Sequence, residues 1–221
     1  FVLGATKATK KVYKVANCCV NEASLEFDID GIATIAWSGM GTIITDETSA
    51  PAATITEGTG VNDTGNFIRN RLTSLSLTTG MGGNHPATYD LVLTGGSVTI
   101  SNNMTFLTPE TLGVVNQPLG HVTGSRSVSG SFTCYLNSED DSSAELFENI
   151  IEDQSTITND FTLLFKVGGT SSPRMEVNLA TCHLEVPSHS IDDVISLETN
   201  FHALPSTIEG TDEITLKYVG A

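Results

Sequence analysis

The chain has 221 residues, and its 10 Lys and Arg against 26 Asp and Glu give a formal net charge of −16. This length suits one domain, which we expect over residues 1–221, and no apolar run is long enough to cross a bilayer. The excess of acidic residues disfavours a protein that binds nucleic acid, because such a protein needs basic surface to displace counterions. A protein that repels nucleic acid is compatible with this charge.

The positive charges are concentrated at the beginning of the chain, where Lys7, Lys10, Lys11 and Lys14 supply four of the ten. Two interpretations stay open for this segment: it docks on an acidic neighbour of the same kind, or it is simply a solvated terminus. A first strand is predicted from Lys11 to Val20.

The clearest strand pattern lies in residues 23–41, ASLEFDIDGIATIAWSGMG. Apolar side chains alternate here with carboxylates, and the two rows are Leu25, Phe27 and Ile29 against Glu26, Asp28 and Asp30. A kink or bulge is expected at Gly31, with a second extended segment after it. Carboxylates two residues apart on a strand lie about 7 Å from each other and repel by about 0.6 kcal/mol in water, so this row must face solvent. A solvated outer face is the simpler interpretation, and a surface that repels an anion is the alternative.

A segment rich in Thr, Gly, Ala, Asn and Pro follows, from Asp46 to Asn70. It is predicted to be a long loop or loose hairpin, and loops of that length are usually functional or mobile. We therefore expect it to make contacts outside the subunit. The candidate contact residues, together with two lysines of the first segment, are Asp46, Glu47, Glu57, Asp63, Phe67, Arg69, Lys10 and Lys11.

Strand patterns continue along the rest of the chain, and the nearly continuous apolar run at 161–167 predicts a central strand. They lie at 72–77, 89–93, 97–101, 126–137, 161–167, 175–186, 194–203 and 213–219. Thr94, Gly95 and Gly96 resemble a turn, so the strands on either side are expected to form a hairpin. In the segment 194–203, Glu198 lies on the polar face opposite Leu197 and Thr199 in the alternating pattern.

Helical signals occur twice. Thr108 and Pro109 suit the beginning of one short helical turn. A longer helix is expected over 142–153, where Ser142 and Glu145 have the spacing of a capping box. Its apolar stripe is Leu146, Phe147, Ile150 and Ile151, which should lie on a sheet.

Catalytic and metal-binding interpretations are weak. Glu26 and Asp28 share a strand face without an aromatic sugar platform nearby, so glycoside cleavage ranks below a charged surface. The five histidines are scattered, and Ser188, His189 and Asp192 lack the glycine frame of a nucleophile elbow. The four cysteines contain no C-x-x-C spacing, which favours reduced buried thiols. We expect no enzyme activity, no metal and no cofactor.

Several stretches together resemble bacteriophage tail tube (major tail) proteins. They are SLEFDIDGIATIAWSGMG, GGSVTISNNMTFLTPETLG, GHVTGSRSVSGSFTCYL with the acidic helix after it, and SLETNFHALP. The resemblance implies a mostly β fold, a β-sandwich or half-open β-barrel flanked by one α-helix, here with a long inserted loop or hairpin. It also implies homo-hexameric rings that stack into a tube in the tail of the virion, assembled in the bacterial host cytoplasm.

On this resemblance, double-stranded DNA passes through the tube without binding to it, and Glu26, Asp28, Asp30 and Glu198 are expected to face the lumen. The implied partners are the tape measure, tail terminator and baseplate or tail-tip proteins, with a sheath where the tail contracts. No membrane partner is expected. Two alternatives stay open: another β-rich virion protein, such as a capsid decoration or tail accessory protein, and a stand-alone adhesin or binding β-sandwich.

Overall fold

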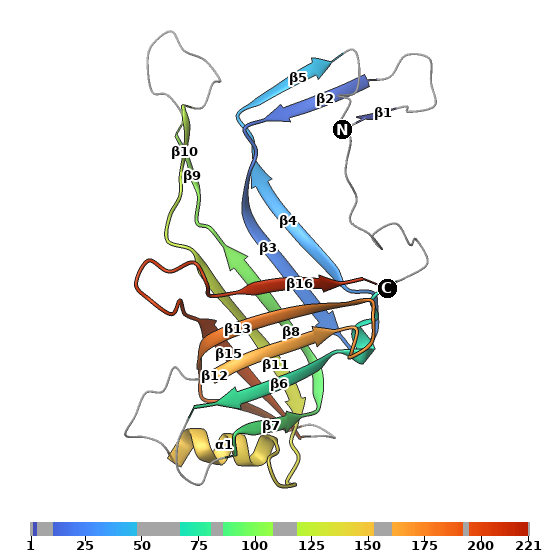
Figure 1. Cartoon of the computed structure of the whole chain (residues 1–221), viewed down its shortest axis with the longest axis vertical. Coiled ribbons are helices and arrows are strands. Elements are labelled where there is room, and N and C mark those ends of the chain that lie inside the picture. The colour runs from blue at the N-terminus through green and yellow to red at the C-terminus, as the bar shows by residue number, and fades with distance from the viewer. Residues whose placement is uncertain are drawn as a thin grey trace. The chain divides into compact units, whose positions relative to one another are not determined.

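The computed structural model describes residues 2–3, 11–47, 67–80, 86–107, 119–152, 161–191 and 195–220. These residues are mostly strands, with one α-helix and one short 3-10 helix among them (Figure 1). The chain divides into two compact units. Unit 1 comprises Phe1–Ala23, Trp37–Gly58 and Ser101–Arg126, and unit 2 comprises Ser24–Ala36, Thr59–Ile100 and Ser127–Ala221. That residues 1–221 form a single domain stays a prediction.

Unit 1 contains two small sheets. The first has the order β1-β2-β5, with β1 at Val2–Leu3, β2 at Lys11–Ala16 and β5 at Ile43–Glu47. The second is the antiparallel pair of β9, Thr105–Leu107, and β10, Gly120–Val122. The first predicted strand is therefore present, and β5 extends into the beginning of the segment predicted as a loop. The helical turn expected at Thr108 and Pro109 lies outside the described residues.

Unit 2 is built on one large sheet. It includes the later half of β3 and the beginning of β4, and the remaining residues of these two strands belong to unit 1. The strand order is β4-β3-β8-β11-β15-β13-β12-β6-β7, with β14 paired to β15 and β16 paired to β13. The strands are β3 Cys19–Asp28, β4 Thr34–Met40, β6 Ser74–Thr79, β7 Thr88–Leu91, β8 Leu93–Ser101, β11 Ser127–Tyr135, β12 Phe161–Val167, β13 Arg174–Leu184, β14 Ser188–Ile191, β15 Ile195–Ala203 and β16 Thr215–Val219.

Aromatic side chains join distant strands of this sheet in one core. The ring of Phe27 on β3 lies 5.2 Å from that of Phe165 on β12, and Phe165 lies 5.9 Å from Phe201 on β15. Since β3 and β12 are separated by four strands in the sheet order, the sheet curls until its inner face meets itself. It stays open and does not close into a barrel. The predicted mostly β, half-open architecture is confirmed.

The predicted flanking helix is also confirmed, as α1 over Ser143–Glu152. It lies against β7 (Figure 1), where the Asn149 amide donates a 2.8 Å hydrogen bond to the Tyr89 hydroxyl. Both residues are buried, so this bond satisfies two polar groups in the core. Burial also raises the pKa of Tyr89.

Among the described residues, no helix has the length and apolar character that a membrane crossing requires.

The beginning of α1 differs from the predicted capping box. The Ser142 hydroxyl donates to the Asn137 carbonyl at 2.6 Å, outside the helix. Glu145 reaches back to accept from the Asp141 N–H at 2.7 Å. The side chains of Ser142 and Glu145 therefore both bond to the loop that precedes the helix, and Ser142 does not cap the helix with its hydroxyl.

The hairpin predicted around Thr94, Gly95 and Gly96 is wrong. All three residues lie within β8, and β7 pairs with β6 instead. A Cβ on Gly96 would stand 2.6 Å from the Ser131 carbonyl oxygen and 2.8 Å from the ring of Phe27. Position 96 requires glycine because a neighbouring strand and an aromatic ring approach the backbone closely there. Sequence pattern alone does not distinguish such a glycine from one in a turn.

Candidate functional site

The later half of β3 carries the acidic row predicted from sequence. Leu25 and Phe27 are 5% and 4% exposed, while Glu26 and Asp28 between and after them are exposed. The alternation predicted for this strand is therefore confirmed up to Asp28. Ile29 is 45% exposed rather than part of the core, because β3 ends at Asp28 and the chain turns.

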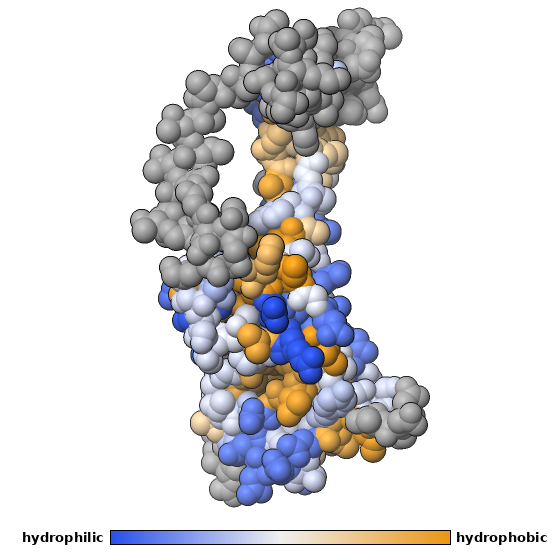
Figure 2. All heavy atoms as spheres, turned by 90° about the vertical axis from the view of Figure 1, so that its right-hand side faces the viewer, coloured by the Kyte–Doolittle hydropathy of each residue, from blue (hydrophilic) through white to orange (hydrophobic). Residues whose placement is uncertain are grey.

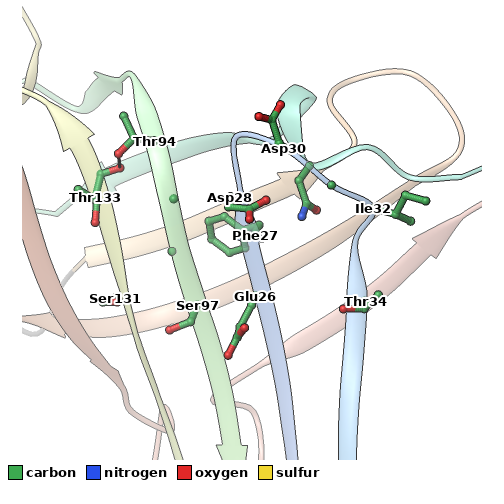
Figure 3. A pocket seen from close by; sticks show the side chains of 14 residues that line it. Glu26, Phe27, Asp28, Asp30, Ile32, Thr34, Thr94, Ser97, Ser131 and Thr133 are labelled. Atoms are coloured by element: carbon green, nitrogen blue, oxygen red, sulfur yellow. Dashed lines mark hydrogen bonds between the residues drawn. The ribbon is translucent and has the colours of Figure 1, made fainter.

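Glu26, Asp28 and Asp30 are among the residues that line a hollow of about 620 Å³ in unit 2, between the side chains of β4 and those of β8 (Figure 3). Hydroxyl side chains from β4, β8 and β11 line much of the remainder: Thr34, Thr94, Ser97, Ser131 and Thr133. No Lys or Arg of the described chain lines it. The hollow therefore presents carboxylates and neutral hydroxyls to solvent, a surface that attracts cations and repels phosphate.

Glu198 on β15 extends this polar surface by one strand. The antiparallel register of β11 and β15 places Thr133 opposite Glu198 and Ser131 opposite Asn200. Because cross-strand partners share a face, Glu198 lies on the same side of the sheet as the hydroxyls of the hollow. Glu198 is exposed and is not itself a lining residue.

Glu185, beside Asn200 of β15, is a further acid that the sequence analysis did not single out. The Asn200 amide donates to Glu185 at 2.9 Å, and the His202 ring lies 3.5 Å from its other oxygen. The hydrogen bond from Asn200 lowers the pKa of Glu185, which keeps that carboxylate ionised at mildly acidic pH. Glu185 falls within the strand predicted over 175–186, and only the pairing of its N–H with the Asn200 carbonyl places it beside Asn200.

The predicted contact residues are spread over both units. Asp46 and Glu47 pair with Tyr13 and Val12 within the first sheet of unit 1, and Lys11 pairs with Leu3. In unit 2, Phe67 is 66% exposed and Arg69 forms a β-bridge with Ile32. The other three residues, Lys10, Glu57 and Asp63, lie outside the described part of the chain. Their contact role stays a prediction.

Unit 1 exposes many large apolar side chains. Their exposed fractions range up to 75%, and the residues are Tyr13, Val20, Trp37, Met40, Ile43, Ile44, Leu107, Leu119 and Val122. Figure 2 shows apolar side chains, in orange, exposed on the surface of the chain. Exposed apolar residues are ordinary on a folded chain, and unit 2 carries them as well, among them Phe67, Leu72 and Ile208.

The cysteines divide into two classes. Cys134 and Cys182 are buried and free, as predicted. Burial raises the pKa of Cys134 to about 11 and that of Cys182 to about 12, which makes both thiols poor nucleophiles. Cys18 is exposed, which contradicts that prediction, and Cys19 is half-buried. The Cys19 sulfur lies 3.2 Å from Nε2 of His121, at a hollow of about 460 Å³ within unit 1.

Thiol labelling should separate these classes. At pH 8, Cys18 is expected to react with an aromatic disulfide reagent within minutes. About 1 in 1,000 Cys134 side chains is a thiolate at that pH, so the two buried thiols should react only after denaturant is added. Mass spectrometry of the labelled peptides checks the order, and labelling of Cys134 or Cys182 as fast as Cys18 would contradict their burial.

Catalytic and metal chemistry finds little support in the geometry. The His189 ring packs edge-on against Phe147 at 4.4 Å, which is a structural contact. Within the described ranges, no three His, Cys, Asp or Glu side chains are grouped so that they could hold a metal ion.

Three comparisons relate the chain to known proteins. The sequence model of the family described as phage tail tube protein matches residues 3–210. The tail tube protein pb6 of Escherichia phage T5 is 32% identical over 206 residues, which cover 90% of this chain and 44% of pb6. The chain thus spans less than half the length of that relative.

Two solved structures of gene transfer agent particles are also similar. One is the virion of the native particle and the other is the tail of the empty particle, at 14% and 15% identity. Each match covers 66% of this chain and 96% of the other, with a TM-score of 0.39.

Proposed function

Because this chain belongs to the phage tail tube protein family, we propose that its copies form hexameric rings that stack into a tube for double-stranded DNA. Family membership supports a structural component of the phage tail, and we propose no enzyme activity for it. A long tube made from subunits of this size requires many copies related by a repeated rotation and translation. The ring size, the stacking and the passage of DNA are the proposed part.

The observation that carries the proposal is the acidic and hydroxylated surface around Glu26 and Asp28. Double-stranded DNA carries one negative charge per about 1.7 Å of its axis, and basic residues would bind it by releasing counterions. A wall of carboxylates and hydroxyls offers no such gain, so DNA would find no position along the bore where it is held. We propose that Glu26, Asp28, Asp30 and Glu198 face the bore.

Contacts between copies would use other surfaces. The exposed apolar side chains of unit 1, among them Trp37 and Ile44, would be covered when subunits meet. We propose contacts between rings or subunits through Asp46, Glu47, Glu57, Asp63, Phe67 and Arg69. Lys10 and Lys11 would contact an acidic neighbouring copy, since the chain carries a net charge of −16.

The tube would also have partners at its ends and inside it. We propose a tape measure protein within the tube before DNA enters, a terminator at one end and a baseplate or tail-tip protein at the other. A contractile tail would add a sheath on the outside. Assembly would take place in the cytoplasm of the bacterial host, before the tail joins the virion.

Negative-stain electron microscopy of the purified full chain tests the proposal. Hollow rods, or rings with six-fold symmetry, are expected. Particles that remain monomeric at every concentration and salt condition would contradict it, as would rings of another symmetry.

Replacement of residues 48–66 by a Gly-Ser linker of equal length tests the contact surface separately. The replacement keeps β5, the described residues after Asn66 and the length of chain between them, so the fold should survive while stacking is lost. We expect soluble particles no larger than one ring by microscopy and sedimentation, with an unchanged circular dichroism spectrum in the strand region. Tubes of normal length from the linker variant would show that the side chains of this segment do not join the rings.

A further inference from the structure

A cysteine and a histidine from distant parts of the sequence meet in unit 1. The sulfur of Cys19, the first residue of β3, lies 3.2 Å from Nε2 and 3.5 Å from Nδ1 of His121 on β10. A neutral imidazole has one protonated and one unprotonated ring nitrogen. Whichever tautomer His121 adopts, an unprotonated nitrogen therefore lies close enough to accept the proton of the Cys19 thiol.

Both residues belong to segments that are held in place within unit 1. The Asn17 amide donates a 3.1 Å hydrogen bond to Oγ1 of Thr42, which connects the turn before Cys19 to the residue before β5. On the other side, β10 pairs with β9, and His121 lies opposite Phe106 with the two rings 6.0 Å apart. The approach of the thiol to the imidazole is thus fixed by two anchored segments.

Cys19 and His121 both line the hollow of about 460 Å³, whose volume is in the range of small-ligand sites. The other described residues that line it are Asn17, Cys18, Thr42, Ile43, Leu119 and Gly120. Although the chain carries a net charge of −16, no Asp or Glu is among these described lining residues. A thiolate at Cys19 would therefore meet no carboxylate within the hollow.

The neighbouring thiol, Cys18, has a different environment. Cys18 is exposed, but its Sγ donates to the Val15 carbonyl at 3.4 Å. A carbonyl oxygen only accepts hydrogen bonds, so this contact stabilises the protonated thiol. Cys19 instead faces a group that can take its proton, and the thiolate is the nucleophilic form of cysteine. Exposure favours reaction at Cys18, whereas hydrogen bonding favours reaction at Cys19.

We propose that Cys19 and His121 form a modification site for the disulfide of a low-molecular-weight thiol. The imidazole accepts the proton of the Cys19 thiol, and the thiolate attacks one sulfur of the disulfide. A new S–S bond forms to Cys19 while the original S–S bond breaks, and the leaving thiolate takes the proton from the imidazolium. Cys19 is oxidised to a mixed disulfide and half of the reagent is reduced to free thiol, so the exchange needs no further oxidant.

This modification is stoichiometric and reversible, and it involves no catalytic turnover. An excess of free thiol runs the same exchange backwards and restores Cys19. While attached, the added group would occupy the hollow and cover the side chains that line it. The state of Cys19 would thereby decide which surface unit 1 presents at this place. The site stands on the geometry of unit 1 and does not depend on assembly into a tube.

Incubation of the purified full chain with oxidised glutathione at pH 7 tests the site. Mass spectrometry with fragmentation of the modified peptide distinguishes Cys19 from Cys18. We expect one glutathione per chain, attached to Cys19, and its release by dithiothreitol. Attachment to Cys18 as fast as to Cys19 would overturn the proposal. A folded chain that stays unmodified at a concentration that modifies the denatured chain would overturn it as well.

Two matched variants compare the adjacent thiols one at a time. Cys18→Ser leaves only Cys19 in this turn, and Cys19→Ser leaves only Cys18. At pH 7, the second-order rate constant for oxidised glutathione should be at least 10-fold larger for Cys18→Ser than for Cys19→Ser, because only Cys19 has a proton acceptor beside it. In denaturant the thiol and the imidazole separate, so the two rate constants should agree within about threefold.

His121→Gln in the Cys18→Ser background tests the imidazole itself. It should lower the rate constant at Cys19 at least 10-fold at pH 7. The rate should then rise about 10-fold per pH unit between pH 6 and 8, as for an unassisted thiol, and less steeply when His121 is present. An unchanged circular dichroism spectrum checks that the fold is intact.

His202→Gln in the same background is the matched control. His202 is an exposed histidine of unit 2 and does not line the hollow. This substitution should change the rate constant at Cys19 less than twofold. Equal rate constants and equal pH profiles for His121→Gln and its parent would refute the role of His121.

Discussion

Replacing both Glu26 and Asp28 by lysine is expected to slow DNA release from virions assembled with the variant subunit by about 10-fold at 50 mM salt. Each subunit gains four positive charge units, and DNA would then be held by counterion release along the whole bore. If four phosphates are neutralised, the affinity falls about 100-fold between 50 and 200 mM salt, so release should recover as salt is raised. Fluorescence of a DNA-binding dye after triggered ejection measures the rate.

The control adds the same charge elsewhere. Glu148 and Glu152 are exposed on α1, which packs against β7 at the other end of the sheet order from β3. Replacing both by lysine should leave the release rate unchanged. Slow release from this variant, or normal release from the β3 variant, would show that the acids of β3 do not line the path of DNA.

Gly96→Ala is expected to destabilise the fold by about 1–3 kcal/mol, the usual cost of overpacking a well-packed region. The added methyl group would stand 2.6 Å from the Ser131 carbonyl oxygen, which belongs to the backbone and has little freedom to move. For a chain of this length, the corresponding fall in Tm is about 2–12 °C.

The neighbouring glycine supplies a matched control. A Cβ on Gly95 would meet only the Phe27 carbonyl oxygen at 3.5 Å, which is an ordinary contact. Gly95→Ala should therefore be neutral or stabilise the fold by up to about 1 kcal/mol, because alanine loses less backbone entropy in a strand. Thermal unfolding followed by circular dichroism measures both variants. Equal Tm values for the two would contradict the close approach of β8 to β11 and Phe27.

The elements that sequence analysis identified correctly are those whose pattern depends on one local period. In β12, every second residue from Phe161 to Val167 is buried, and the sequence shows the same apolar run. The alternation of Leu25 and Phe27 with acids is of the same kind. The predicted stripe of α1 is correct for Leu146, Phe147 and Ile150, whereas Ile151 is 38% exposed and the polar Asn149 is buried. Burial on one face dictates such patterns, so they can be read without knowing which strand lies next to which.

The features that were missed depend on contacts between distant segments. Gly96 looks like a turn residue until Phe27 and Ser131 are seen beside it. Asn70 lies in a stretch of turn formers, and only the backbone pairing of residues 68–70 with residues 31–33 places it at the end of β3. The division into two units likewise follows from which segments pair, and no change in composition marks it.

Cryo-electron microscopy of tubes assembled from the full chain tests the central claim most directly. We expect six-fold rings in which the side chains of Glu26 and Asp28 project into the bore, with no lysine or arginine side chain reaching it near them. A tube in which these two carboxylates lie on the outer surface, or in which basic side chains line the bore, would contradict this account.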